Sequence, residues 1–187
     1  MLRIIGGKLS GRKIEAPRGR TTRPTSDRVR EAIFNIIAHH DWGKAIGNPL
    51  SKTDVLDAFC GTGALAFEAL SRGCINATLF DMDPQALRIA KSNAEKLGLT
   101  KTCNIMRMDA TRPPRAQKSH HLVFLDPPYG KDLIAPSLAA LDGQGWIGKH
   151  TLVLAETASD NEPALPDQFT LILSRIYGDT AAHFIAR

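Results

Sequence analysis

Four consecutive residues, Asp126-Pro127-Pro128-Tyr129, could bind a planar group that carries an NH2. The carboxylate and the backbone carbonyls accept hydrogen bonds, and the tyrosine ring can stack on a flat partner. The apolar residues 122–125 predict a buried strand, which two prolines must end because they cannot donate to a sheet. Open α/β sheets bind ligands at this end of their strands. An ordinary turn would use the same residue types, so the rest of the chain must decide.

A second stretch, Asp57-Ala58-Phe59-Cys60-Gly61-Thr62-Gly63, has the composition of a cofactor-binding turn between a strand and a helix. Glycines let the backbone approach a ligand closely, and the sequence from Gly61 matches the dinucleotide pattern G-x-G-x-x-G/A. Asp81 ends the next predicted strand at about the spacing of an acid that holds both ribose hydroxyls. Nicotinamide or flavin enzymes and S-adenosylmethionine (SAM) enzymes both need these features.

Two acids favour SAM over a dinucleotide. Asp57 precedes the glycine turn, where its charge would repel a diphosphate but would suit the ammonium group of SAM. Asp109 follows a third predicted strand and could accept a hydrogen bond from an adenine amino group. Several acids in one cleft therefore indicate a positively charged cofactor, and an NAD enzyme remains as an alternative.

Positive charge is concentrated at the N-terminus. Residues 1–30 carry nine Lys or Arg and two acids, whereas the net charge of the whole chain is +5. Such asymmetry suggests a polyanionic partner. No aromatic residue precedes Phe34, so this segment should contact mainly the phosphates of a nucleic acid. Three widely spaced cysteines indicate a reducing compartment and no zinc site, and no apolar run predicts a membrane span.

The order of the predicted elements indicates an α/β fold with a mainly parallel, doubly wound sheet. A helix is expected from Thr25-Ser26-Asp27 to near Trp42-Gly43, and another over residues 84–97 with Gly98 as its C-cap. Strands and helices alternate from residue 54, with a fifth strand at 152–155 and an antiparallel pair at the end. We therefore expect a basic N-terminal hairpin at residues 1–24 and an α/β domain at residues 25–187.

These motifs resemble, in order, those of class I SAM-dependent methyltransferases, which have a Rossmann-like fold. The N-terminal runs Arg3-Ile4-Ile5-Gly6-Gly7-Lys8 and Arg23-Pro24-Thr25-Ser26-Asp27-Arg28 are more specific. Together with the Asp-Pro-Pro-Tyr motif they resemble the RsmD family of 16S ribosomal RNA guanine-N2 methyltransferases, which modify guanine 966. The resemblance covers essentially the whole chain. It implies a bacterial, cytoplasmic, monomeric enzyme that uses SAM and acts on 16S rRNA within a small-subunit assembly intermediate.

The resemblance also implies a role for each of three groups of residues. Asp126, Pro127 and Tyr129 would form the catalytic acceptor site, and no metal is expected. The cofactor would be held by Thr25, Arg28, Asn35, Asp57, Phe59, Gly61, Thr62, Gly63, Asp81, Met82, Asp109 and Ala110. The RNA would be bound by Arg3, Lys8, Arg12, Lys13, Arg18, Arg20 and Arg23.

An exocyclic amine is a poor nucleophile because its lone pair is delocalised into the ring. Asp126 and the Pro127 carbonyl would accept its two N–H groups, and Tyr129 would stack on the flipped base, so the site would mainly align the reactants. The tetrapeptide alone would equally suit adenine-N6 methylation of RNA or DNA, or methylation of a glutamine carboxamide in a protein. From another class, a non-catalytic RNA-binding module remains. Guanine N2 is indicated only by the N-terminal resemblance.

Overall fold

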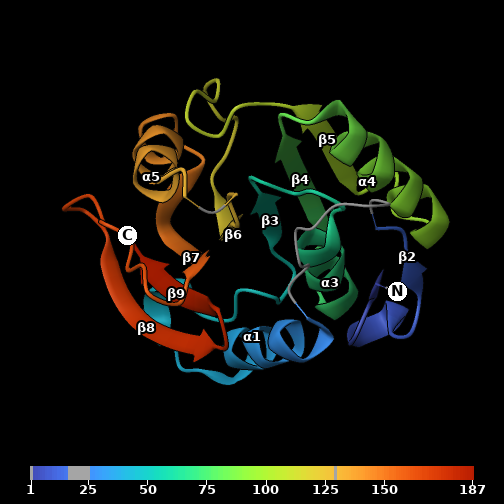
Figure 1. Ribbon diagram of the computed structural model, residues 1–187, viewed down its shortest axis with the longest axis horizontal. Helices are drawn as coiled ribbons and strands as arrows, with labels where there is room; N and C mark the ends of the chain where they lie inside the picture. Colours follow the sequence, from blue (N-terminus) through green and yellow to red (C-terminus); the bar gives the residue numbers. More distant parts are fainter. Residues whose placement is uncertain (1, 17–25, 129) are drawn as a thin grey trace.

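The computed structural model describes residues 2–16, 26–128 and 130–187. A seven-stranded sheet with the strand order β5-β4-β3-β6-β7-β9-β8 forms the centre of the molecule (Figure 1). Five neighbouring strands of this sheet are parallel: β5 (Cys103–Arg107), β4 (Asn76–Asp81), β3 (Asp54–Asp57), β6 (His120–Leu125) and β7 (Ile147–Ala158). The order of winding reverses between β3 and β6, which makes this boundary the topological switch point where such sheets bind ligands.

Helices cover both faces of the sheet because its central strands are buried on both sides. In β6, Leu122 and Phe124 face one hydrophobic cluster, while Val123 and Leu125 face the other. The first cluster contains residues of α1 (Asp27–His39), α3 (Ala64–Arg72) and α4 (Pro84–Leu97), and the second contains those of α5 (Ile134–Gly143). A parallel sheet covered on both faces is the doubly wound architecture that the sequence predicts.

Local signals set the limits of α4. The Asp83 side chain caps the helix by accepting a hydrogen bond from Gln85 N at 2.8 Å, and Pro84 occupies the first turn. Gly98 ends the helix in the left-handed conformation, with a φ of 72°. The predicted range of residues 84–97 and the predicted C-cap are both confirmed.

One expectation for α1 is wrong. The helix ends at His39 rather than near Trp42-Gly43, and a separate short helix, α2 (Gly43–Ile46), follows. Arg30 of α1 is buried, with only 1% of its surface exposed. Its Nη2 donates to the Arg3 carbonyl at 2.6 Å and to Asp27 Oδ1 at 3.0 Å, so one partner comes from the distant N-terminal segment and the other from the first turn of the same helix.

The end of the chain forms the expected antiparallel addition, β8 (Thr170–Tyr177) and β9 (Thr180–Ala186). β9 lies between β7 and β8, so β8 forms the edge of the sheet. The fifth strand, expected at residues 152–155, is longer than predicted, because β7 pairs with β9 as far as the Ala158–Thr180 pair. Among the described residues, no helix has the length and apolar character needed to cross a bilayer.

An N-terminal hairpin of β1 (Leu2–Arg3) and β2 (Lys13–Ile14) encloses the short 3-10 helix η1 (Gly7–Leu9). It lies beside α3 and α4 (Figure 1), and the buried Glu68 of α3 accepts hydrogen bonds from Ile5 N and Gly6 N, both at 2.8 Å. Its apolar residues belong to the first hydrophobic cluster: Leu2, Ile4 and Ile14. The expected boundary at residue 24 lies outside the described residues.

Candidate functional site

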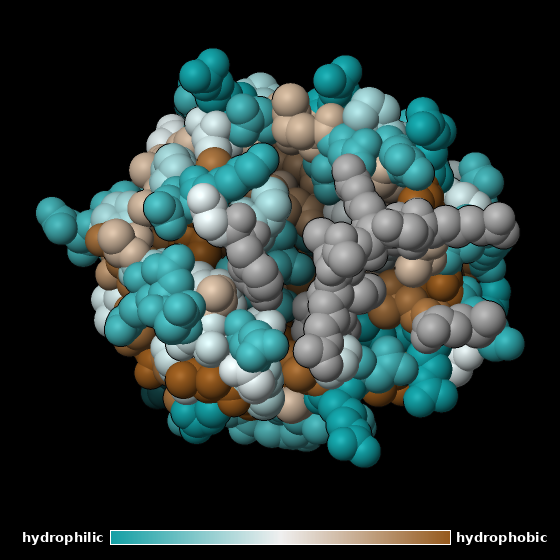
Figure 2. All heavy atoms as spheres, in the orientation of Figure 1, coloured by the Kyte–Doolittle hydropathy of each residue, from teal (hydrophilic) through white to brown (hydrophobic). Residues whose placement is uncertain are grey.

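The carboxyl ends of four parallel strands bring together the acids that the sequence singled out. Asp57 and Asp81 end β3 and β4, and Asp109 and Asp126 follow β5 and β6. Figure 2 shows a hollow near the centre of the view, over the end of β3 in Figure 1. Parallel strands end at the same edge of a sheet, so this arrangement forms one acidic cleft at the switch point.

Asp57 is the most deeply buried of these acids, with 1% of its surface exposed. Its Oδ2 accepts a hydrogen bond from Ala66 N at 3.3 Å, whereas its Oδ1 has no hydrogen-bond partner among the described residues. Burial, followed by the negative charge of Asp126, raises the pKa of Asp57 to about 8. A buried acceptor in a negative environment fits a ligand that brings a cationic donor.

Asp126 is half-buried at the end of β6, and burial raises its pKa to about 6. Its neighbour Pro127 is buried. The third predicted catalytic residue, Tyr129, lies outside the described residues. The carboxyl groups of Asp57 and Asp126 lie at the ends of adjacent strands. A positively charged ligand near both groups would reduce the repulsion between their negative charges.

The glycine turn after β3 depends on two left-handed residues, Gly61 with a φ of 51° and Gly63 with a φ of 82°. A Cβ on Gly63 would lie 2.4 Å from the Phe67 ring, whereas a Cβ on Gly61 would have no neighbour within 4 Å. Gly63 therefore allows α3 to pack on its own first turn. Gly61 leaves open space beside the backbone, as close approach by a ligand requires.

Asp81 is held against this turn. Its Oδ2 accepts from Gly61 N and its Oδ1 accepts from Asp83 N, both at 2.8 Å. These bonds fix the carboxylate at the rim of the cleft while each oxygen keeps a second lone pair. Thr62 contributes its carbonyl, which accepts from Asn93 Nδ2 at 3.1 Å and joins the turn to α4.

The remaining predicted cofactor residues of the cleft differ in exposure. Asp109 Oδ1 accepts from the Thr111 hydroxyl at 2.7 Å and from Thr111 N at 2.9 Å, and these bonds lower the pKa of Asp109. Ala110 is buried in the second hydrophobic cluster and Phe59 is half-buried against it, while Met82 is 52% exposed. Acids and apolar surface thus lie side by side at the ends of β4 and β5.

The other predicted cofactor-binding and RNA-binding residues lie on α1, on the hairpin or outside the described residues. Arg28 and Asn35 are exposed on α1, and Thr25 lies outside the described residues. The predicted RNA-binding residues Arg3, Lys8, Arg12 and Lys13 are exposed on the hairpin, whereas Arg18, Arg20 and Arg23 lie outside the described residues. Arg3 Nε pairs with Asp27 Oδ2 at 3.1 Å. Roles for these residues stay predictions.

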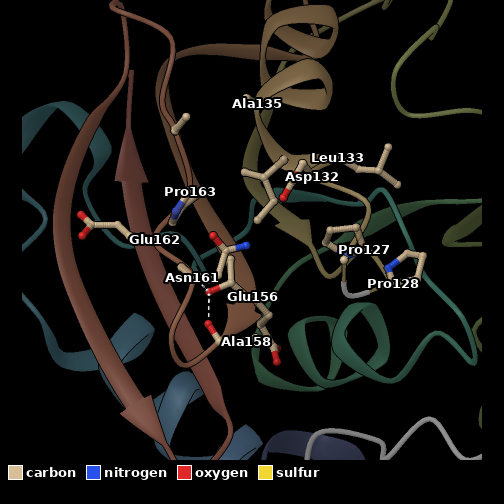
Figure 3. Close-up of a pocket in the computed structure, with 14 residues that line it drawn as sticks. Pro127, Pro128, Asp132, Leu133, Ala135, Glu156, Ala158, Asn161, Glu162 and Pro163 are labelled. Atoms are coloured by element: carbon tan, nitrogen blue, oxygen red, sulfur yellow. Dashed lines mark hydrogen bonds between the residues drawn. The ribbon is translucent and has the colours of Figure 1, made fainter.

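A cavity of about 210 Å³ is lined in part by Pro127 and Pro128, the two residues that follow Asp126 in the chain. Figure 3 shows Pro127, Pro128 and Asp132 on one side of this cavity, and Glu156, Asn161 and Pro163 on the other. Glu156 belongs to β7 and is 1% exposed. Sequence reasoning assigned no role to Glu156, although an acid directly after a predicted strand was a usable signal.

The sequence matches the family described as Conserved hypothetical protein 95 over residues 2–186. The chain belongs to this family. Ribosomal RNA small subunit methyltransferase D of Escherichia coli (strain K12) is 34% identical over 191 residues, which cover 100% of this chain and 90% of that protein. These matches confirm the resemblance to the RsmD family.

Two solved structures support the fold. The protein yhhF from Escherichia coli has a TM-score of 0.82 and 31% identity, with 100% of this chain and 97% of that chain covered. An RNA methyltransferase from Salinibacter ruber, in complex with S-adenosyl-L-homocysteine, has a TM-score of 0.63, with 87% of this chain and 92% of that chain covered. At 13% identity this second likeness concerns the fold alone. The expected Rossmann-like methyltransferase fold is confirmed.

Proposed function

We propose that this protein transfers a methyl group from SAM to the exocyclic N2 amino group of a guanine in 16S ribosomal RNA. The proposal rests above all on two buried or half-buried acids, Asp57 and Asp126, at the ends of the adjacent strands β3 and β6. Asp57 suits a cationic cofactor, and Asp126 opens the acceptor motif beside a cavity. Family membership supports an RNA substrate, and the choice of guanine N2 follows the resemblance of the N-terminal motifs.

The cofactor lies along the strand ends in this proposal. Asp57 accepts from its ammonium group, Gly61 and Gly63 let its methionine part approach the backbone, and Asp81 accepts from the ribose hydroxyls. Further contacts come from Phe59, Thr62, Met82, Asp109 and Ala110 at the adenine end, and from Thr25, Arg28 and Asn35 before β3. SAM supplies an activated methyl group, and no metal is required for its transfer.

Asp126, the Pro127 carbonyl and Tyr129 hold the target amine. The two acceptors bind its N–H groups and turn the nitrogen lone pair toward the methyl group, while the ring of Tyr129 stacks on the base. An Asp126 pKa of about 6 leaves the carboxylate mostly ionised at neutral pH, so that it can also accept the released proton. The base must leave its stack to reach this position.

The basic hairpin is the RNA-binding part of the proposal. Arg3, Lys8, Arg12 and Lys13 extend from a hairpin that is packed on the body of the enzyme, and their contacts go to phosphates. We infer, from the family resemblance, a cytoplasmic monomer that acts on 16S rRNA within a small-subunit assembly intermediate. Ribosomal RNA presents unpaired bases in loops, where a base can reach the site.

The test is methyl transfer from isotopically labelled SAM to small-subunit particles and to naked 16S rRNA, followed by nucleoside mass spectrometry. We expect N2-methylguanosine from the wild-type protein. Asp126→Ala should reduce the rate by about 100-fold or more while SAM still binds, because the amine loses an oriented acceptor. Asp167→Ala, which removes an exposed acid from the loop before β8, is the matched control and should keep full activity.

The product identifies the reaction. N6-methyladenosine would replace the guanine proposal with adenine methylation, and a labelled protein would indicate a protein substrate. RNA binding without any SAM binding in calorimetry would leave a binding module. Full activity of Asp126→Ala would contradict the catalytic role of Asp126.

A further inference from the structure

We propose that Asn93 couples the basic hairpin to the glycine turn of the cleft, so that RNA and SAM each strengthen the binding of the other; this inference rests on the proposed function. Asn93 lies on α4 and is 0% exposed. Its side chain binds two segments that are far apart in the chain: Glu15, which follows β2 of the hairpin, and Thr62, in the turn after β3. One buried side chain thus contacts both proposed binding regions.

The amide of Asn93 makes three hydrogen bonds, all to backbone atoms. Its Oδ1 accepts from Glu15 N at 2.7 Å, and its Nδ2 donates to the Glu15 carbonyl and to the Thr62 carbonyl, both at 3.1 Å. Both N–H groups of the amide are used in this way. The side chain therefore cannot release either segment without leaving a buried polar group unpaired.

The glycine turn is held between this amide and an acid of the cleft. Thr62 lies between two left-handed glycines. Gly61 N donates to Asp81 Oδ2 at 2.8 Å, beside the proposed ribose site, while the carbonyl of the next residue is bound by Asn93. A ligand that orders the turn therefore also orders Asn93 and, through it, the backbone at Glu15.

The sign of the coupling follows from these shared bonds. Ordering a backbone segment costs conformational entropy, and two segments joined through one side chain share part of that cost. When RNA on the hairpin has already ordered the backbone at Glu15, less ordering remains for SAM to impose, so SAM binds more tightly. By linkage, SAM must strengthen RNA binding by the same factor.

A second contact between the hairpin and α4 is weaker. The Lys96 ammonium group pairs with the Glu15 carboxylate, but both side chains are half-exposed, so water and salt screen the pair. Glu15→Gln removes this ion pair and keeps the backbone atoms that Asn93 binds. It is therefore the matched control for Asn93→Ala, which removes the buried bridge.

The experiment measures the affinity for radiolabelled S-adenosylhomocysteine by equilibrium dialysis. Each protein is tested alone and with saturating 16S rRNA or small-subunit particles, whichever the wild-type protein methylates. We expect RNA to raise the wild-type affinity at least about fivefold, and S-adenosylhomocysteine to raise RNA affinity by the same factor. Asn93→Ala should bring both factors close to one, whereas Glu15→Gln should keep the wild-type factors.

The ratio of affinities distinguishes coupling from a merely structural role. If Asn93→Ala weakened both ligands but kept the wild-type factor, Asn93 would only support the fold. A wild-type factor of one would overturn the inference without any variant. A wild-type protein that binds no S-adenosylhomocysteine, or methylates no RNA, would contradict the proposed function itself.

Amide hydrogen exchange of the wild-type protein tests the same bridge, and decides the question if Asn93→Ala does not fold. The Glu15 N–H donates to Asn93, so S-adenosylhomocysteine should slow its exchange at least about fivefold, although Glu15 follows a strand of the hairpin. The Ile5 N–H, which donates to Glu68 on α3, is the comparison and should change less. Equal protection of both amides, or protection of neither, would contradict the role of Asn93.

Discussion

The buried carboxyl group of Asp57 holds a proton that a cationic ligand should displace. Its folded-state pKa of about 8 lies above the ordinary value of 3.8, so the free protein is mostly protonated here at pH 7. The free energy of unfolding should therefore decrease as the pH rises from about 4 through 8, because the unfolded chain loses this proton first. A bound ammonium group favours the charged carboxylate and reverses the preference.

Binding of SAM at pH 7 should consequently release close to one proton. Calorimetry in two buffers of different ionisation enthalpy measures this release, which should disappear above about pH 9 as the free carboxyl group ionises. Asp57→Asn should abolish the release and weaken binding. Asp109→Asn is the control, since the pKa of Asp109 is lowered and its carboxylate is ionised throughout. An unchanged release in Asp57→Asn would show that another group titrates.

The place of a single residue was predictable where it depends on position along a strand. Asp57, Asp81 and Asp126 could be placed at one edge of the sheet from sequence, because an acid after the apolar run of a parallel strand lies at the carboxyl edge of the sheet. The burial of Arg30 could not be predicted, because one of its partners is the Arg3 carbonyl in a separate hairpin. Glu156 was visible as an acid, but the cavity beside it forms only when the loop after β7 folds back.

At the scale of elements, two left-handed glycines with different surroundings allow the cost of backbone strain to be measured separately from the cost of overpacking. Gly98 ends α4 with a φ of 72° and has open space where a Cβ would be. Gly63 precedes α3 with a φ of 82°, and a Cβ there would lie 2.4 Å from Phe67 and 3.1 Å from Leu79. An alanine at position 98 would be strained but not overpacked, whereas an alanine at position 63 would be both strained and overpacked.

Gly98→Ala should lower the free energy of unfolding by about 1 kcal/mol, the cost of a left-handed alanine. Gly63→Ala should lower it by about 1–3 kcal/mol more, because Phe67 must move within the core. Urea unfolding followed by tryptophan fluorescence measures both values, since Trp42 and Trp146 are buried. Equal losses in the two variants would mean that the Phe67 ring relaxes freely.

The limits of elements were predictable where one residue enforces them. Pro84 and Gly98 fix both ends of α4 locally, and the prolines after Leu125 fix the end of β6. The end of α1 at His39 has no such residue, so its apolar pattern seemed to continue to Trp42. The length of β7 depends on pairing with β9, which joins the sheet from later in the chain.

At the scale of the whole molecule, the basic hairpin and the catalytic body share one hydrophobic core. Deleting the hairpin would remove Leu2, Ile4 and Ile14 from that core, so a deletion cannot separate RNA binding from folding. Substitution of exposed charged residues can separate RNA binding from folding. Lys8 and Lys13 are exposed on the hairpin, which makes them suitable sites.

Lys8→Ala combined with Lys13→Ala should weaken RNA binding more at low salt than at high salt. The slope of log K against log salt concentration should decrease by about one to two, as expected when two phosphate contacts are lost. Thermal unfolding checks that the fold is retained. Lys101→Ala combined with Lys149→Ala removes the same charge from exposed sites outside the hairpin and should leave the slope unchanged. If the two double variants had the same slope, the hairpin would not be the segment that binds the RNA phosphates.

The interior position of β9 has a consequence for how this protein is made. β9 is the last of the seven strands to be translated, yet it lies between β7 and β8 and pairs with both. A nascent chain that has not yet released β9 must leave one edge of β7 open, and β8 has no neighbour to join. The sheet therefore closes only after translation has passed Ala186, and a ribosome that stalls earlier yields a chain in which one edge of β7 is unpaired.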